Sequence, residues 1–243
     1  MRCTLGMGGC LLAMALLDGG GLFSAEPKVE TPQVVIEHEL RDVEGWPVLV
    51  DRRLLDGAEA ELGAEALKVL QHELYELSLV VPAEKVAEMR KVRIYLDLDH
   101  PLNALQYHPG AGWLKDHGYD VAMEKAVHIP KAKSLISHSK KNEQPWVMLH
   151  ELAHAYHDQV LGFDNVPIMK AFEKAKASGK YEKVLHIRGH KTKHYALTNH
   201  KEYFAEMSES YFGTNDFYPF VLGELKESDV DTYEMLTDIW GKR

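Results

Sequence analysis

The sequence predicts an α+β fold, built as one domain after a short N-terminal segment. Runs in which apolar and polar residues alternate, typical of half-buried strands, lie mainly in the first half of the chain. Runs in which apolar residues recur every three or four positions, typical of amphipathic helices, occur in both halves. The 243 residues suffice for a substantial core, and no repeat, linker or long charge run divides them.

The first segment, residues 1–25, differs from the rest of the chain. Arg2 precedes a mostly apolar stretch that begins at Cys3, and small residues follow it. This pattern is typical of a secretory signal peptide, and the apolar run is too short to span a bilayer. We therefore expect a secreted or periplasmic protein with a mature domain of residues 26–243, the alternative being a retained short anchor. Cleavage would remove both cysteines, Cys3 and Cys10, and with them all thiol chemistry.

The strands are expected mainly before residue 130. Leu67, Leu70, Leu74 and Leu77 recur at helical spacing between two groups of β-prone runs. In chain order we expect a hairpin of strands at 34–40 and 46–50, a helix at 61–80, a strand at 91–98, a loop at 100–119 and a short strand at 126–129. Pro130 ends the last strand, which favours a position at the edge of the sheet because proline cannot donate a ladder hydrogen bond.

The second half is expected to be mostly helical. Leu149, Leu152, Ala153, Tyr156 and Val160 share one face of a predicted helix. We expect helices at 144–161, 168–177, 199–212 and 229–240, with a second hairpin at 184–195 around Gly189.

Composition narrows the classes of function. The net charge is −9, with 37 acidic against 28 basic residues, which argues against a nucleic-acid-binding protein that relies on overall charge. Two cysteines cannot form a disulfide framework or a four-thiolate zinc site. The chain has 14 histidines, so we ask whether any of them have the spacing of metal ligands.

Two histidines have ligand spacing. His150 and His154 are four positions apart in the predicted helix at 144–161, so both side chains lie on one face and can reach a single Zn²⁺ ion. Glu151 follows the first histidine, beside the metal but angled away from it. A general base that takes a proton from metal-bound water must lie there.

A third ligand is needed, since catalytic zinc usually takes three protein ligands and a water. Positions 157 and 160 hold His157 and Val160, which excludes the metzincin pattern. Glu202 and Glu206 share a face of the helix predicted at 199–212, so one can bind zinc while the other hydrogen-bonds a ligand histidine. The alternative for Glu202 is a purely structural role in a capping box with Asn199.

These residues carry a resemblance to a known family. The pattern resembles the catalytic domain of anthrax lethal factor and related zincins, over roughly residues 145–212, in His150-Glu-x-x-His154 and in Tyr195-x-x-Thr198-Asn199-x-x-Glu202-x-Phe204-Ala205-Glu206. The resemblance implies a zincin-like, gluzincin-type domain in which one helix carries the histidines and a later helix carries the glutamate.

The resemblance also implies roles for individual residues. His150, His154 and Glu202 would be the zinc ligands and Glu151 the general base. Tyr195 would stabilise the oxyanion or assist the leaving amine, and Glu206 would be an acid that supports a ligand histidine. Tyr195 as an ordinary core aromatic remains the alternative for that position.

A competing third ligand is Asp216. The stretch Gly213-Thr214-Asn215-Asp216-Phe217-Tyr218 partly resembles the aspzincin pattern, but its tyrosine comes one residue early and Pro219 replaces a glycine. We therefore interpret Asp216 and Tyr218 as loop or pocket residues. His157 is expected at the surface or beside a ligand, and Asp158 is expected to be an exposed charge.

Together these patterns predict a zinc-dependent endopeptidase. Zinc would activate a water, Glu151 would accept its proton, and an extended protein or peptide substrate would pair with the strand at 126–129. No nucleic-acid partner and no stable membrane span are expected. The alternatives are a non-catalytic zinc-containing binding or structural domain, and an aspzincin-type peptidase that uses Asp216.

Overall fold

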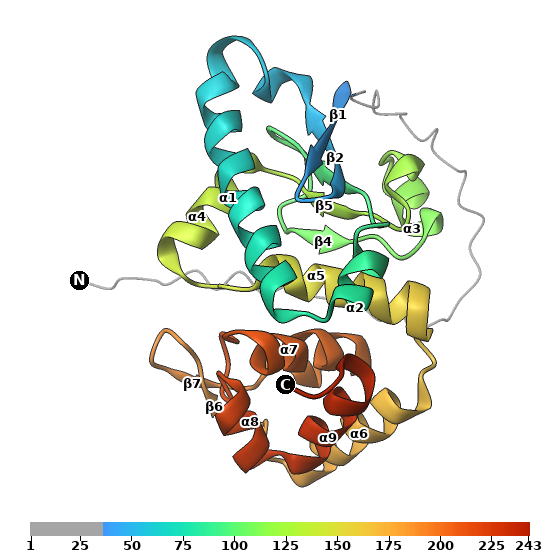
Figure 1. The fold of residues 1–243 in the computed structure, drawn as a ribbon, viewed down its shortest axis with the longest axis vertical. Helices are drawn as coiled ribbons and strands as arrows, with labels where there is room; N and C mark the ends of the chain where they lie inside the picture. The colour runs from blue at the N-terminus through green and yellow to red at the C-terminus, as the bar shows by residue number, and fades with distance from the viewer. Residues whose placement is uncertain (1–35) are drawn as a thin grey trace, which may run out of the picture. The chain divides into compact units, whose positions relative to one another are not determined.

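A five-stranded mixed sheet forms the N-terminal part of the domain (Figure 1). The computed structural model describes residues 36–243, so the expected signal peptide lies outside the described residues. The strands are β1 (His38–Val43), β2 (Trp46–Asp51), β3 (Ile94–Leu96), β4 (Gln106–Tyr107) and β5 (Val127–Ile129), in the spatial order β1-β2-β3-β5-β4. β2, β3 and β5 are parallel, whereas β1 and β4 run antiparallel to their neighbours.

The expected edge position of the strand at 126–129 is wrong. β5 pairs with β3 on one side and with β4 on the other, so β4 is the edge strand on that side of the sheet. The prediction failed because β4 is only two residues long, within a stretch whose prolines and glycines resemble a loop. Pro130 lies just beyond the last paired residue of β5 and therefore costs no ladder hydrogen bond. The same expected loop also contains α3 (Ala111–Asp116).

Helices make up most of the rest. They are α1 (Ala60–Val80), α2 (Ala83–Met89), α4 (Ala132–Lys141), α5 (Val147–Tyr156), α6 (Val166–Ser178), α7 (His200–Phe212), α8 (Leu222–Ser228) and α9 (Val230–Trp240). The five helices expected from periodicity are confirmed, and α5 continues as a π-helix over His157–Leu161. The short helices α2, α4 and α8 were not predicted. The second hairpin is present as β6 (Val184–Leu185) and β7 (Lys191–Thr192).

Helix α5 occupies the middle of the domain, between the sheet and the C-terminal helices (Figure 1). All of its residues are buried, and it packs against α7 on one side and against β4 and β5 on the other. A helix buried on every face normally carries apolar residues alone. Its polar residues His150, Glu151 and His154 must therefore find partners inside the protein.

Within residues 36–243, no helix combines the length and the apolar character needed to cross a bilayer.

Candidate metal centre

Helices α5 and α7 bring three ligand atoms together. His150 Nε2 and His154 Nε2 lie 3.1 Å apart, and Glu202 Oε2 lies 3.2 Å from each of them. Atoms bound at about 2.0–2.1 Å to one tetrahedral zinc ion are about 3.3–3.4 Å apart. The spacing of these three atoms therefore fits a single bound ion.

Glu202 is held at the first turn of α7 by the local sequence. The Asn199 side chain caps the helix, accepting hydrogen bonds from the amides of Lys201 and Glu202 at 2.9 and 3.1 Å. Burial would raise the pKa of the Glu202 carboxyl, but hydrogen bonds from His150 and His154 lower it well below its usual range. The Glu202 carboxylate is therefore ionised and points at His150 and His154. Glu202 also lies in the capped first turn of α7.

Glu209, one turn beyond Glu206, supports the first histidine. Its Oε1 lies 2.7 Å from His150 Nδ1, whereas Glu206 Oε1 is 3.8 Å away and Glu206 Oε2 accepts a hydrogen bond from Asn215. The hydrogen bond expected of Glu206 is therefore made by Glu209. A proton on Nδ1 leaves the lone pair of His150 Nε2 free for a metal. No local pattern distinguishes these two glutamates, which lie three residues apart on a wholly buried segment of α7.

Glu151 lies beside these ligands and is fixed from the sheet. Its Oε2 accepts a 2.7 Å hydrogen bond from the backbone amide of Tyr107 in the edge strand β4. Burial raises the pKa of the Glu151 carboxyl, while the neighbouring His150 and His154 oppose the rise. A buried carboxylate with raised proton affinity is suited to accept a proton.

Tyr195 begins a short 3₁₀ helix, η5 (Tyr195–Leu197), just before α7. Its side chain is 48% exposed, which does not suit the alternative of a core aromatic. Burial of part of the ring raises the pKa of the phenol, and the negative charge of Glu202 raises it further. The hydroxyl is therefore protonated at neutral pH. The preceding His194 is buried and stacks on Phe217.

Asp216 pairs with His186 rather than with His150 or His154. It is buried, with one oxygen 3.6 Å from His186 Nε2, and burial together with the charge of Glu209 raises its pKa to about 7. Among residues 36–243, the histidine pair groups with Glu202 and not with Asp216. The geometry thus favours Glu202 as the third ligand.

His157 and Asp158, which follow His154 along the chain, differ from expectation. His157 is fully buried, edge-on to Phe163 and Phe204, because the π-helix turns it into the core. Asp158 is not an exposed charge, since its Oδ2 accepts hydrogen bonds from the Tyr107 hydroxyl at 2.7 Å and from Lys125 at 2.6 Å. The contact with Tyr107 links the π-helix to β4. A local sequence pattern does not predict such contacts, because the partners lie far apart along the chain.

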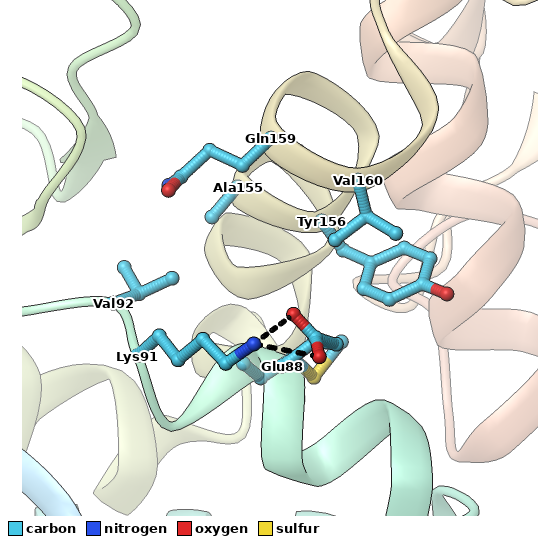
Figure 2. A pocket seen from close by; sticks show the side chains of 8 residues that line it. Glu88, Lys91, Val92, Ala155, Tyr156, Gln159 and Val160 are labelled. Atoms are coloured by element: carbon cyan, nitrogen blue, oxygen red, sulfur yellow. Dashed lines mark hydrogen bonds and ion pairs between the residues drawn. The ribbon is translucent and has the colours of Figure 1, made fainter.

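A separate pocket of about 180 Å³ opens between α2 and the end of α5 (Figure 2). Lys91 is bound there by Glu88 at 2.6 Å. The pocket is lined by Glu88, Met89, Lys91, Val92, Ala155, Tyr156, Gln159 and Val160. No residue of the candidate metal centre lines it.

Comparison of the chain with protein families, with curated proteins and with solved structures finds no match.

Proposed function

We propose that the protein is a zinc-dependent endopeptidase in which His150, His154 and Glu202 hold the ion. The observation that carries this proposal is the triangle of ligand atoms, with sides of 3.1, 3.2 and 3.2 Å, next to a buried glutamate on the same helix. Bound zinc would polarise the scissile carbonyl and acidify a water.

Glu151 would act as the general base. One of its oxygens is occupied by the Tyr107 amide, which leaves the other to accept a proton from the attacking water. The same carboxyl would then deliver that proton to the leaving nitrogen. Its raised pKa supports this role because the carboxylate then binds a proton more strongly than an exposed glutamate does.

Tyr195 would assist from the exposed side. Its protonated phenol can donate a hydrogen bond to the oxygen on which negative charge develops.

The proposed substrate is an extended stretch of protein or peptide in a secreted or periplasmic setting. Since β5 is paired on both sides, the strand proposed to pair with a substrate is β4, the edge strand that packs against α5. β4 is also the strand whose amide holds Glu151, so a peptide along it would run past the base.

The test pairs metal analysis with a peptide-library cleavage screen on the wild type and on Glu151→Gln. We expect the variant to keep its zinc and to lose cleavage, while Glu84→Gln, an exposed change of equal charge on α2, behaves as the wild type. Full cleavage by Glu151→Gln would overturn the mechanism. Zinc binding without cleavage by the wild type would favour a non-catalytic domain, and loss of zinc in Asp216→Ala but not in Glu202→Ala would favour the aspzincin alternative.

A further inference from the structure

A second cluster of histidines surrounds one buried aspartate on the opposite face of the sheet from α5. Side chains alternate along β5, so Val127 and Ile129 join the core that contains α5 while His128 points to the other face. Asp97 follows β3 directly. The other histidines of the cluster come from β1, from the segment between β3 and β4, and from the end of β4: His38, His100 and His108.

The ligand atoms in this cluster are closely spaced. Asp97 Oδ2 lies 2.8 Å from His128 Nε2, and one atom each of Asp97, His100 and His128 lie within 4.8 Å of one another. His38 Nε2 approaches the other oxygen, Asp97 Oδ1, at 2.7 Å, and His108 Nε2 lies 3.4 Å from His128 Nδ1. Since Asp97 and His128 are already at contact distance, His100 is the ligand that would have to move toward an ion.

The donor types of the three groups suit a metal. Asp97 offers a carboxylate oxygen, and His100 and His128 each offer an imidazole nitrogen, the kinds of atom that bind divalent transition metals.

We propose that Asp97, His100 and His128 bind a second divalent transition-metal ion of the zinc class. His38 and His108 orient Asp97 and His128 by the contacts given above. The ion joins β3, β5 and the segment that leads to β4, and it lies across the sheet from the candidate centre. The His100 Nδ1 atom accepts a hydrogen bond from the Leu102 amide. Coordination through Nε2 moves the ring proton to Nδ1, so this hydrogen bond is released on binding.

The test counts Zn²⁺ ions that remain bound in competition with a chelator of micromolar affinity. We expect two ions per chain in the wild type, one in His100→Gln, and one in His154→Gln, which removes a ligand of the first centre. His117→Gln serves as the matched control, because His117 is an exposed histidine of the adjacent aromatic group, stacked on Trp113, and should leave two ions.

Cobalt provides an independent readout of the same site. In His154→Gln, Co²⁺ should give visible absorption bands that disappear in the double variant with His100→Gln. A single ion in the wild type that is lost in His154→Gln, two ions in His100→Gln, or Co²⁺ bands that survive in the double variant would each overturn the proposal. An ion retained in His154→Gln and absent from the double variant supports it whether or not any cleavage is seen.

Discussion

At the scale of single residues, the candidate centre depends on which acid faces each histidine. His150 is in contact with carboxylates on both ring nitrogens, Glu202 at Nε2 and Glu209 at Nδ1. The first contact is to a prospective ligand, and the second fixes which nitrogen carries the proton. Residues that touch no metal thus decide whether the ring can bind one.

Glu209→Gln should weaken zinc binding by about 10- to 100-fold, because a neutral amide holds the Nδ1 proton of His150 less strongly. Competition with a chelator measures this change. Glu206→Gln is the control, since Glu206 is bonded to Asn215 and lies 3.8 Å from the ring. A larger loss in Glu206→Gln than in Glu209→Gln would show that the supporting acid is misassigned.

Tyr195→Phe should lower kcat by about 10²- to 10³-fold and leave zinc content unchanged, since it removes one donor to the developing oxyanion. Steady-state kinetics on a peptide found in the cleavage screen measures the effect. Tyr75→Phe, which deletes the hydroxyl of a similarly exposed tyrosine on α1, should have no effect. Unchanged kcat in Tyr195→Phe would exclude the tyrosine from the reaction.

At the scale of elements, the three candidate ligand residues lie close together only if α5 and α7 keep their relative position. Trp146 precedes α5, and its ring packs directly on Gly213, the residue that follows α7. A Cβ atom at position 213 would lie 2.0 Å from that ring. The close approach of these two residues therefore holds the start of α5 against the end of α7.

Gly213→Ala should destabilise the protein by roughly 1–3 kcal/mol, because the added methyl group displaces the Trp146 ring. Urea unfolding measures the change in free energy. Gly223→Ala within α8 is the matched control: nothing lies within 4 Å of its added Cβ, and alanine is favoured over glycine in a helix by about 0.5–1 kcal/mol. Equal stability changes in the two variants would contradict this account of the packing.

At the scale of the whole molecule, stability is expected to depend on a partly buried acid far from the candidate centre in sequence. Burial raises the pKa of Glu73 on α1 to about 8, and the charge of Glu76 adds to the rise. Within the described residues, Glu73 Oε2 has no hydrogen-bond partner. Between about pH 4.5 and 8, the unfolded chain loses the Glu73 proton while the folded protein keeps it. This group therefore makes the protein less stable as the pH rises through that window.

Glu73→Gln should remove this dependence. The free energy of unfolding of the wild type should fall relative to that of the variant between pH 5 and 8, by at most about 1.4 kcal/mol per pH unit. Urea unfolding at several pH values measures the difference. Glu84→Gln, an exposed change of equal charge, should run parallel to the wild type. A parallel curve for Glu73→Gln as well would mean that the carboxyl is ionised in the folded protein.

The sequence by itself determined the features that depend on neighbouring residues. Helical periodicity predicted α5 and α7, and the i,i+4 spacing put His150 and His154 on one face. The cap at Asn199 fixed Glu202 in the first turn of α7. These inferences held because helix geometry and capping are set within a few residues of the chain.

Only the tertiary structure decided the features that join distant segments. In the folded protein β4 is the edge strand beside β5, Glu209 rather than Glu206 hydrogen-bonds His150, and His157 is buried in the core. The packing of α5 against α7 and the sheet, which local propensity does not encode, sets each of these outcomes. A buried polar group must find a partner wherever packing leaves one, and that partner can lie tens of residues away along the chain.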